Sequence, residues 1–257
     1  MQLIFRPRVE LWSCGGGRQS AGIAALIVQG RLPMPDHVIM VALEWERKAT
    51  YHYVCTYIRP AMRALNIPFT FVSRKKYATK NFFGGTSGFV PLVPGYTNQS
   101  GQPSKLSEFC SGEWKREVAL RWSAGQPEWK ERGVNNWIGI SLDERHRRRA
   151  PRRAWHQPTY PLLDVIPMGV AGCLAAVSTI GWPEPPRSRC YHCPNQSDSE
   201  WLELTPEEFE LACWRDERLR ETDPHVFLHK KMIPLRQVVL NPHENGFFGG
   251  CSSGTCY

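Results

Sequence analysis

The chain has 257 residues, of which 42% are hydrophobic and 22% are charged, a balance typical of globular rather than disordered proteins. Its longest apolar runs, 22–28 and 165–177, are shorter than the stretch of about 20 residues that spans a bilayer. Residues 1–10 lack the apolar core of a secretory signal. We therefore expect a cytoplasmic protein without a membrane partner. The net charge of +8 favours an anionic partner such as a nucleotide or a nucleic acid.

The N-terminal part alternates strand and helix patterns, as short βα units do. The patterns predict a weak strand over 3–11, a helix over 20–30, a buried strand over 37–43, a helix over 51–65 that is kinked or broken at Pro60, and a strand over 69–73. This order predicts an α/β fold with an open, mostly parallel sheet and flanking helices.

Further along the chain, the stretch 76–105 is rich in Gly, Pro, Ser, Thr and Asn and is expected to be a functional loop. A helix over 114–122 and a strand over 137–142 follow. Another helix is expected to begin near Thr205, because Thr205 suits the N-cap and Pro206 suits the first turn. Glu207 and Glu208 complement the positive end of that helix.

A glycine-rich turn with the sequence SCGGGRQS spans 13–20, between the first strand and the first helix. Its three glycines let the backbone approach a phosphate closely, and the N–H groups at a helix start attract anions. Ser20 adds a hydroxyl group and Arg18 adds a positive charge. The spacing matches neither the Walker motif nor GxGxxG. We interpret the turn as an anion cradle, with a plain strand-to-helix turn as the alternative.

The nine cysteines are an odd number, and without an export signal they indicate reduced thiols rather than a disulfide framework. Cys190 and Cys193 form a C-x-x-C pair, which suits zinc or an iron–sulfur cluster, with metal-free thiols as the alternative. His192, inside the pair, is expected to be a solvent-facing spacer. Four cysteines have apolar or helical surroundings and are interpreted as structural: Cys14, Cys55, Cys173 and Cys213.

Six arginines lie between Arg145 and Arg153. Such a run is either a solvated face or a surface that binds the phosphates of RNA or DNA.

The turn 15–20 with the Ala- and Ile-rich helix after it resembles the PP-loop of the adenine nucleotide α-hydrolase-like superfamily. More narrowly, it is similar to the variant in phosphoadenylyl-sulfate (PAPS) reductase-like proteins of phages and mobile elements, some of which accompany type IV CRISPR loci. Many members have Ser-Gly-Gly-x-Asp-Ser there, whereas Gly15 stands here at the first Ser position and Gln19 at the Asp position. Further segments that resemble the family are 41–46, 137–141, 143–145, 160–162, 188–194, 227–229 and 234–235.

The resemblance implies a PP-loop nucleotide-binding domain over 1–185 and a small C-terminal cysteine-rich helical module over 186–257 packed on it. It also implies ATP or a PAPS-like adenine nucleotide as ligand, with Glu46 near the ribose or a Mg²⁺ ion. Arg18, Lys115 and Arg145 are the candidate cations that stabilise phosphoryl charge. The residues expected to hold the phosphates are Gly15, Gly16, Gly17, Gln19 and Ser20.

The family's iron–sulfur reductases place a cysteine pair upstream of the C-x-x-C at an interval like that of Cys110, and Phe109 replaces the first member of that pair here. The implied site is a 4Fe–4S cluster, or a zinc ion, with Cys251 as an alternative fourth ligand. Its ligands are expected to be Cys110, Cys190, Cys193 and Cys256.

Three functions are compatible with these features. The first is an enzyme that binds ATP and adenylates an acceptor or transfers sulfur. The second is a sulfonucleotide reductase with thioredoxin as electron source, although the tail lacks that family's Glu-Cys-Gly-(Ile/Leu)-His motif. The third is a non-catalytic accessory protein of a phage or CRISPR system, whose arginine run contacts RNA or DNA.

Overall fold

The computed structural model describes residues 7–78, 95–107 and 109–243. Its main sheet has five strands in the order β3-β2-β1-β6-β7, and every neighbouring pair is parallel. The expected open parallel α/β sheet is confirmed. The strands are β1 (Val9–Ser13), β2 (His37–Ala42), β3 (Phe69–Ser73), β6 (Val134–Ile138) and β7 (His156–Thr159).

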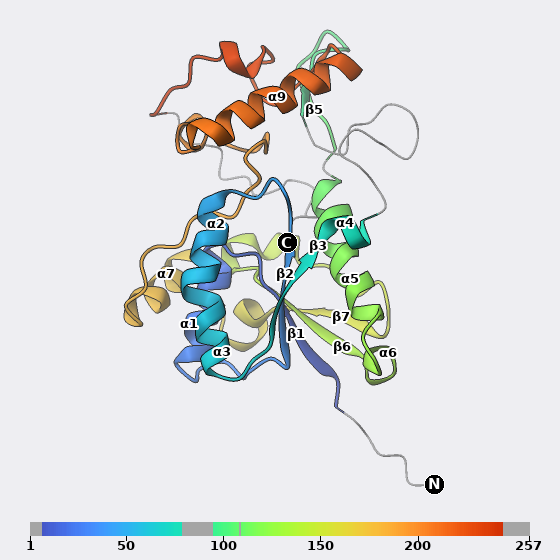
Figure 1. The fold of residues 1–257 in the computed structure, drawn as a ribbon, viewed down its shortest axis with the longest axis vertical. Helices are drawn as coiled ribbons and strands as arrows, with labels where there is room; N and C mark the ends of the chain where they lie inside the picture. Colours follow the sequence, from blue (N-terminus) through green and yellow to red (C-terminus); the bar gives the residue numbers. More distant parts are fainter. Residues whose placement is uncertain (1–6, 79–94, 108, 244–257) are drawn as a thin grey trace.

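Helices cover both faces of this sheet (Figure 1), which explains why its central strands read as apolar runs. Successive side chains of a strand point to opposite faces. Trp12 therefore packs into the cluster beneath α1 (Arg18–Val28), whereas its neighbour Leu11 packs into the cluster beneath α5 (Glu117–Ala124).

Close packing of α1 on α7 (Val170–Thr179) depends on a glycine. A Cβ atom on Gly22 would lie 2.6 Å from the Cβ atom of Cys173. The missing side chain lets the two helices approach each other at this point.

The second helical segment is continued rather than broken at Pro60. It comprises α2 (Lys48–Tyr53), a π-helical turn (Val54–Ile58) and α3 (Arg59–Ala64), and Pro60 lies in the first turn of α3. A proline lacks the N–H group that an α-helix uses. The helical segment accommodates this missing hydrogen bond through the π-helical turn directly before α3.

Several expected boundaries move. The first strand lies at Val9–Ser13, and residues 1–6 of the expected range are outside the described part of the chain. The expected strand over 137–142 begins earlier and ends at Ile138, because the chain turns there and Ile140 N–H bonds to Ile138 C=O. The helix expected over 114–122 is confirmed as a π-helical turn (Gly112–Arg116) followed by α5.

The stretch expected to be a long loop contains two short strands, β4 (Tyr96–Thr97) and β5 (Ser104–Lys105), while residues 79–94 lie outside the described part. β8 (Val226–Phe227), far along the chain, pairs with β4. The remaining short helical segments are α4 (Arg74–Tyr77), α6 (Trp129–Arg132), a 3₁₀ turn (Leu142–Arg147), a π-helical turn (Pro161–Val165) and a 3₁₀ turn (Leu235–Gln237).

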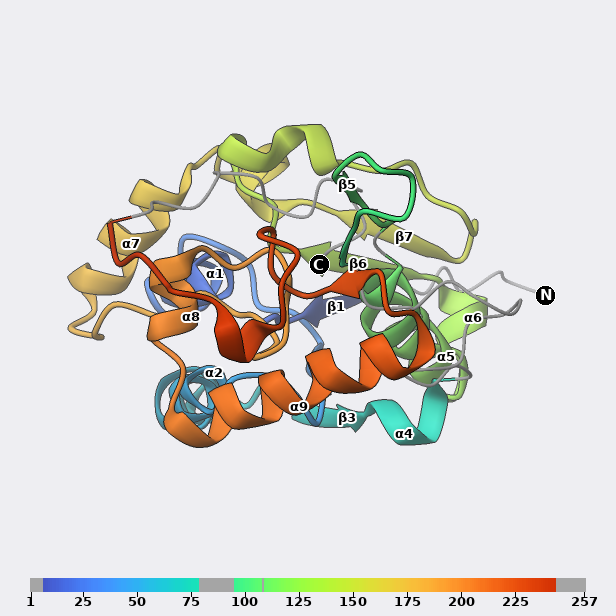
Figure 2. The same ribbon diagram turned by 90° about the horizontal axis from the view of Figure 1, so that it is seen from above.

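Two helices form the C-terminal part, α8 (Asp198–Leu202) and α9 (Pro206–Thr222), and both begin in a capping box. Thr205 accepts a hydrogen bond from Glu208 N–H, and the Glu208 carboxylate accepts one from Thr205 N–H, which confirms Thr205 as the N-cap. Figures 1 and 2 show α9 lying across the end of the molecule at which β2 and β3 finish. The division of the chain at residue 185 stays a prediction.

Two buried carboxylates hold the segment after α9. Asp216 accepts hydrogen bonds from the N–H groups of Leu228 (2.9 Å) and Leu235 (2.8 Å). Asp198 accepts one from Asn241 N–H (2.9 Å) and lies 3.0 Å from the His229 ring. Within the described residues, no helix is long and apolar enough to cross a membrane.

Candidate functional site

The glycine-rich turn joins β1 to α1 and is held from within. Cys14 N–H bonds to Ile39 C=O (2.8 Å), which keeps the start of the turn beside β2. Gly15 N–H then donates to the hydroxyl group of Ser20 (2.9 Å), and Gly17 is the N-cap of α1. Ser20 therefore closes the turn, and the first N–H groups of α1 are those that lack partners within a helix.

Packing explains two of the glycines. Gly16 has φ +75°, and a Cβ atom there would lie 2.7 Å from Thr50 Cγ2 and 2.9 Å from Val54 Cγ2. A Cβ atom on Gly17 would lie 3.1 Å from Ser188 N. The absence of a side chain at Gly16 lets α2 pack against the turn. The absence of a side chain at Gly17 lets the segment before the cysteine pair pack against it from the other side. A larger residue at position 16 would collide with Thr50 and Val54. A substitution there therefore cannot test how closely a phosphate approaches the turn.

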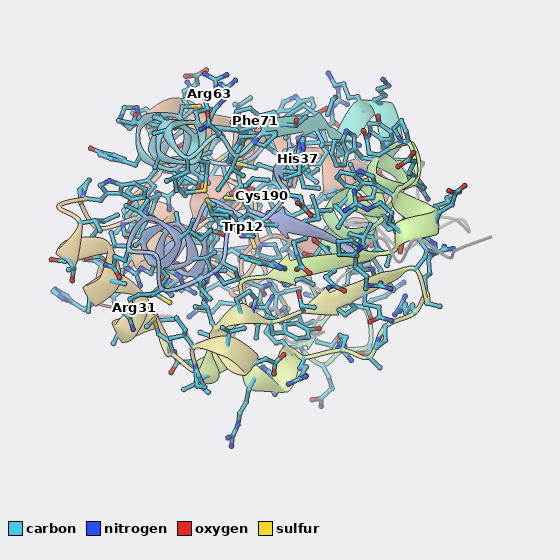
Figure 3. All side chains as sticks on the ribbon, turned by 90° about the horizontal axis from the view of Figure 1, so that it is seen from below. Trp12, Arg31, His37, Arg63, Phe71 and Cys190 are labelled. Carbon is cyan, nitrogen blue, oxygen red and sulfur yellow. The ribbon has the colours of Figure 1, made fainter. Side chains whose placement is uncertain are left out.

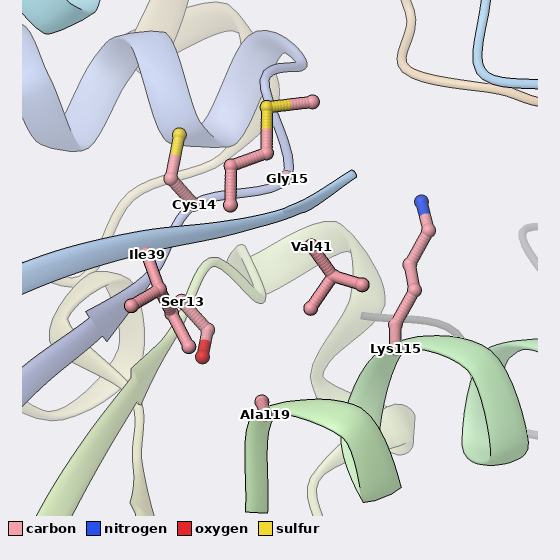
Figure 4. Close-up of a pocket in the computed structure, with 8 residues that line it drawn as sticks. Ser13, Cys14, Gly15, Ile39, Val41, Lys115 and Ala119 are labelled. Atoms are coloured by element: carbon pink, nitrogen blue, oxygen red, sulfur yellow. The ribbon is translucent and has the colours of Figure 1, made fainter. Parts of the chain in front are cut away.

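A cavity lies at the carboxyl ends of β1 and β2, where open α/β sheets bind their ligands. Figure 4 shows the Lys115 side chain extending from its helical segment beside Val41, with the glycine-rich turn on the far side of β2. The lining residues are Ser13, Cys14, Gly15, Ile39, Met40, Val41, Lys115 and Ala119.

A buried network links this cavity to the cysteine pair. Lys115 Nζ lies 3.0 Å from Glu46 Oε2, and Ser188 Oγ donates to Glu46 Oε1 (2.9 Å). The Glu46 side chain is 0% exposed. Burial by itself lowers the pKa of Lys115, but the charges of Glu46 and Cys190 and the hydrogen bond to Glu46 raise it above its ordinary value. Lys115 is therefore a fixed positive charge, and both oxygens of Glu46 have protein partners.

The other candidate nucleotide residues lie around the start of α1. Gln19 Nε2 donates to Glu144 Oε2 (3.1 Å), so this side chain is already held by a carboxylate. Arg18 pairs with Glu184 (2.7 Å), and Arg145 is exposed on the 3₁₀ turn. Of the three expected phosphate cations, Lys115 is the one that lines the described cavity.

The cysteine pair is attached to the turn after β2 by backbone pairing. Cys190 forms an antiparallel bridge with Glu46, and Tyr191 N–H bonds to Trp45 C=O (2.9 Å). Cys193 N–H bonds to Cys190 C=O (3.0 Å), which makes the tight turn that the C-x-x-C spacing predicts.

Cys110 and Cys190 both pack against the hydrophobic cluster that includes Trp45 and Trp114. Burial and the Glu46 charge raise the pKa of Cys190 well above its ordinary value, and Cys193 and Cys110 raise it further. Among the described residues, no group of three or more His, Cys, Asp or Glu side chains is arranged to hold a metal ion. Cys251 and Cys256 lie outside the described residues. The four-cysteine site therefore stays a prediction.

Two expectations about single residues are wrong. His192 is 1% exposed rather than solvent-facing, because its ring packs against Trp45 and Tyr191. Burial and the charge of Arg215 lower the pKa of His192 well below its ordinary value. Cys55 is exposed on its π-helical turn, whereas the other three cysteines interpreted as structural are buried as expected.

The arginine run is not a uniform face. Arg147 is buried and donates to Glu144 (2.6 Å). Arg148 pairs with Asp164 (2.7 Å) and lies over the Tyr160 ring. Besides Arg148, four arginines of the run are exposed: Arg145, Arg149, Arg152 and Arg153.

Sequence reasoning gave no role to several residues of the site. Ser188 had one signal, its place two positions before Cys190. Trp45 and Trp114 pack edge to face at 4.8 Å between ring centroids, and the Arg74 guanidinium lies 4.5 Å from the Trp45 ring. These two contacts bring together residues from distant segments, which no local pattern indicates.

No family model and no curated protein matches the sequence. Among solved structures, the chain is similar to "U34-tRNA thiolase NcsA from Methanococcus maripaludis with its 4Fe-4S cluster", at 13% sequence identity. The match covers 87% of this chain and 70% of that chain, with a TM-score of 0.43. A likeness this distant carries no argument about function, so the geometry of the site must support any functional conclusion.

Proposed function

We propose that this chain is a nucleotide-binding enzyme of the PP-loop type. It binds ATP or a related adenine nucleotide at the turn 15–20 and transfers an adenylyl group or sulfur to an acceptor. The observation that carries the proposal is the network of Lys115, Glu46 and Ser188, which joins the cavity beside the glycine-rich turn to the cysteine pair.

In this proposal, groups of the site stabilise the negative charge of the nucleotide's phosphates. The first N–H groups of α1 and the Lys115 ammonium stabilise negative charge that develops on a phosphoryl oxygen. Glu46 positions Lys115 and keeps it protonated by its own negative charge. Such fixed charges stabilise the transition state without having to reorganise during the reaction.

The described thiols match the donor chemistry of an iron–sulfur cluster or a zinc ion. Cys110 and Cys193 both act electrostatically on Cys190, and Cys256 is the proposed fourth ligand. A bound cluster would supply sulfur chemistry or hold the C-terminal segment over the nucleotide.

One experiment tests the metal part. Replacement of Cys110, Cys190 or Cys193 by Ala is expected to remove metal and to lower stability together, because metal binding energy is folding energy when the unfolded chain has no site. Cys55→Ala is the matched control, since Cys55 is exposed on the α2–α3 helical segment. The readouts are iron and zinc analysis and the absorption spectrum under anaerobic conditions. Equal metal content in Cys110→Ala and the parent would remove Cys110 from the site.

Calorimetry with ATP and with PAPS tests the nucleotide part. Binding of neither nucleotide at millimolar concentration would refute the proposed function. Release of sulfite from PAPS with thioredoxin would instead identify a sulfonucleotide reductase, and release of AMP or pyrophosphate from ATP would support the proposal.

A second candidate function is a nucleic-acid accessory role in a phage or CRISPR system. It is favoured by the exposed arginines Arg145, Arg149, Arg152 and Arg153, which lie close together in sequence. Such a surface binds RNA or DNA backbones mainly through phosphate contacts.

A further inference from the structure

The cysteine pair lies on the first of two consecutive tight turns, and we call residues 190–196 the cysteine turn. Cys193 N–H bonds to Cys190 C=O (3.0 Å) and closes the first of the two. Gln196 N–H bonds to Cys193 C=O (3.3 Å) and closes the second. Both share Cys193, so the position of its thiol depends on the backbone geometry of both.

The side chain of Gln196 ties the two halves of the cysteine turn together. Its Nε2 atom donates to Tyr191 C=O (3.0 Å) in the first half and to Cys193 C=O (3.2 Å) at the junction. A side-chain amide has two N–H donors, so it can make both bonds at once. Tyr191 is also held from outside, because its N–H group bonds to Trp45 C=O (2.9 Å). The amide therefore fixes the backbone at both ends of the segment 191–193.

The burial of this amide points to a role beyond stability. Gln196 is 6% exposed, and its Oε1 atom is buried without a hydrogen-bond partner among the residues that the structure describes. A buried acceptor that lacks a partner lowers stability, and an apolar side chain of the same length would avoid this loss. Gln196 therefore holds the cysteine turn although one of its own polar atoms is left unpaired.

Helix α8 supports the cysteine turn from both flanks. Ser197, directly after Gln196, is the N-cap of α8, and its N–H group donates to Glu200 Oε2 (2.9 Å). The other oxygen of the same carboxylate, Glu200 Oε1, lies 3.3 Å from Nε of Arg189, the residue directly before Cys190. One carboxylate thus holds the residues that precede and follow the cysteine turn, and Gln196 acts from a fixed base.

We propose that Gln196 is a positioning residue that keeps the cysteine turn in the form that binds a metal ion. This inference rests on the metal site of the proposed function and adds a residue that acts on the thiol ligands through the backbone, without touching the metal. A turn whose geometry is fixed before binding loses little freedom on binding, so it binds more tightly. Groups that orient metal ligands in this way typically change metal affinity by about 10- to 100-fold.

The test titrates the full chain with Zn²⁺ and with Co²⁺, whose absorption spectrum reports thiolate coordination. Gln196→Met keeps the length of the side chain and removes both N–H donors. We expect it to weaken both metals by at least about tenfold and to reduce the thiolate charge-transfer absorption of bound Co²⁺. Gln196→Asn, whose amide is one methylene shorter, is the second variant and should change affinity and spectrum in the same direction.

Gln126→Met is the matched control. Gln126 Nε2 also donates to a backbone carbonyl, that of Trp122 (3.1 Å), at the end of α5. This variant loses a comparable hydrogen bond away from the cysteines, so it should keep the metal affinity and the Co²⁺ spectrum of the parent.

The outcomes separate this inference from the proposed function. If the parent binds metal and a folded Gln196 variant keeps its affinity and spectrum, the positioning role is wrong and the metal site stands. If Gln126→Met weakens metal binding as much as Gln196→Met does, the effect is a general loss of stability, which also overturns the inference. If the parent binds neither probe and contains no iron, the metal site itself is refuted, and this inference with it.

Discussion

Lys115 Nζ lies 3.0 Å from Glu46 Oε2, in a network that continues through Ser188 to the segment of the cysteine pair. The two residues come from different sides of the site, Glu46 from the turn after β2 and Lys115 from the π-helical turn before α5. A buried ion pair of this kind fixes the position of both charges. Removal of one partner leaves the other charge buried and uncompensated.

We predict that Glu46→Gln lowers the free energy of unfolding by about 3 kcal/mol. Lys115→Met should have a similar effect, and the double variant should lose less than the sum of the two, because each single change already breaks the pair. Urea unfolding of the four proteins measures this coupling. Arg218→Gln, at an exposed pair with Glu221, is the control and should change stability much less. Additive effects at Glu46 and Lys115 would contradict the paired arrangement.

Gly16→Ala is predicted to destabilise the protein more than Gly30→Ala. Both glycines have positive φ angles, +75° and +67°, so each alanine incurs the backbone cost of about 1 kcal/mol. Only at Gly16 does the new Cβ atom also collide with Thr50 and Val54, whereas the space beside Gly30 is open. The difference between the two unfolding free energies isolates the packing of α2 on the turn. Equal losses would show that α2 moves aside freely.

His156 predicts a pH dependence of stability. Burial and the charges of Arg8 and Arg153 lower the pKa of His156 from 6.5 to about 4, against the opposing effects of its backbone hydrogen bond and the charge of Glu117. Between these values the unfolded chain binds a proton that the folded chain does not. Stability is therefore expected to fall as the pH decreases from about 6.5 to about 4, by up to about 3 kcal/mol for this group.

His156→Gln removes the titrating group and should flatten this part of the stability profile. The measurement is urea unfolding at several pH values in that interval, compared with the parent. A variant whose stability decreases with acidity as steeply as the parent would assign the effect to other groups.

The exposed arginines predict a salt effect on nucleic-acid binding. If Arg149, Arg152 and Arg153 each contact a phosphate, their replacement by Ser should reduce the slope of log affinity against log salt by about 3. Arg148 is left in place because it pairs with Asp164, and Arg145 because of its candidate role toward the nucleotide. Fluorescence anisotropy with an RNA and a DNA oligonucleotide over a salt series gives the slope.

The charge-matched control for this series replaces three exposed arginines of other elements by Ser: Arg31, Arg63 and Arg218. Figure 3 shows Arg31 and Arg63 at the periphery of the molecule, away from Trp12 at its centre. An unchanged slope in the triple variant, or a parent that binds no nucleic acid at low salt, would make the run an ordinary solvated face.

The sequence by itself determined the features that depend on short-range forces. The spacing of apolar residues predicted β2 and β3, and the capping box at Thr205 predicted the start of α9. The glycine-rich turn was also visible, because three consecutive glycines before an apolar helix constrain the backbone locally. Each of these signals extends over a few residues, and the elements that they predict are present in the folded structure.

Only the tertiary structure decided which side chains share the site. Ser188 and Glu46 are 142 positions apart and meet through a hydrogen bond, and Lys115 reaches the same carboxylate across 69 positions. The burial of His192 follows from a neighbour supplied by a distant segment, the ring of Trp45. Contacts over such separations are set by the crossovers of a parallel sheet, and those crossovers leave no periodic pattern in the sequence.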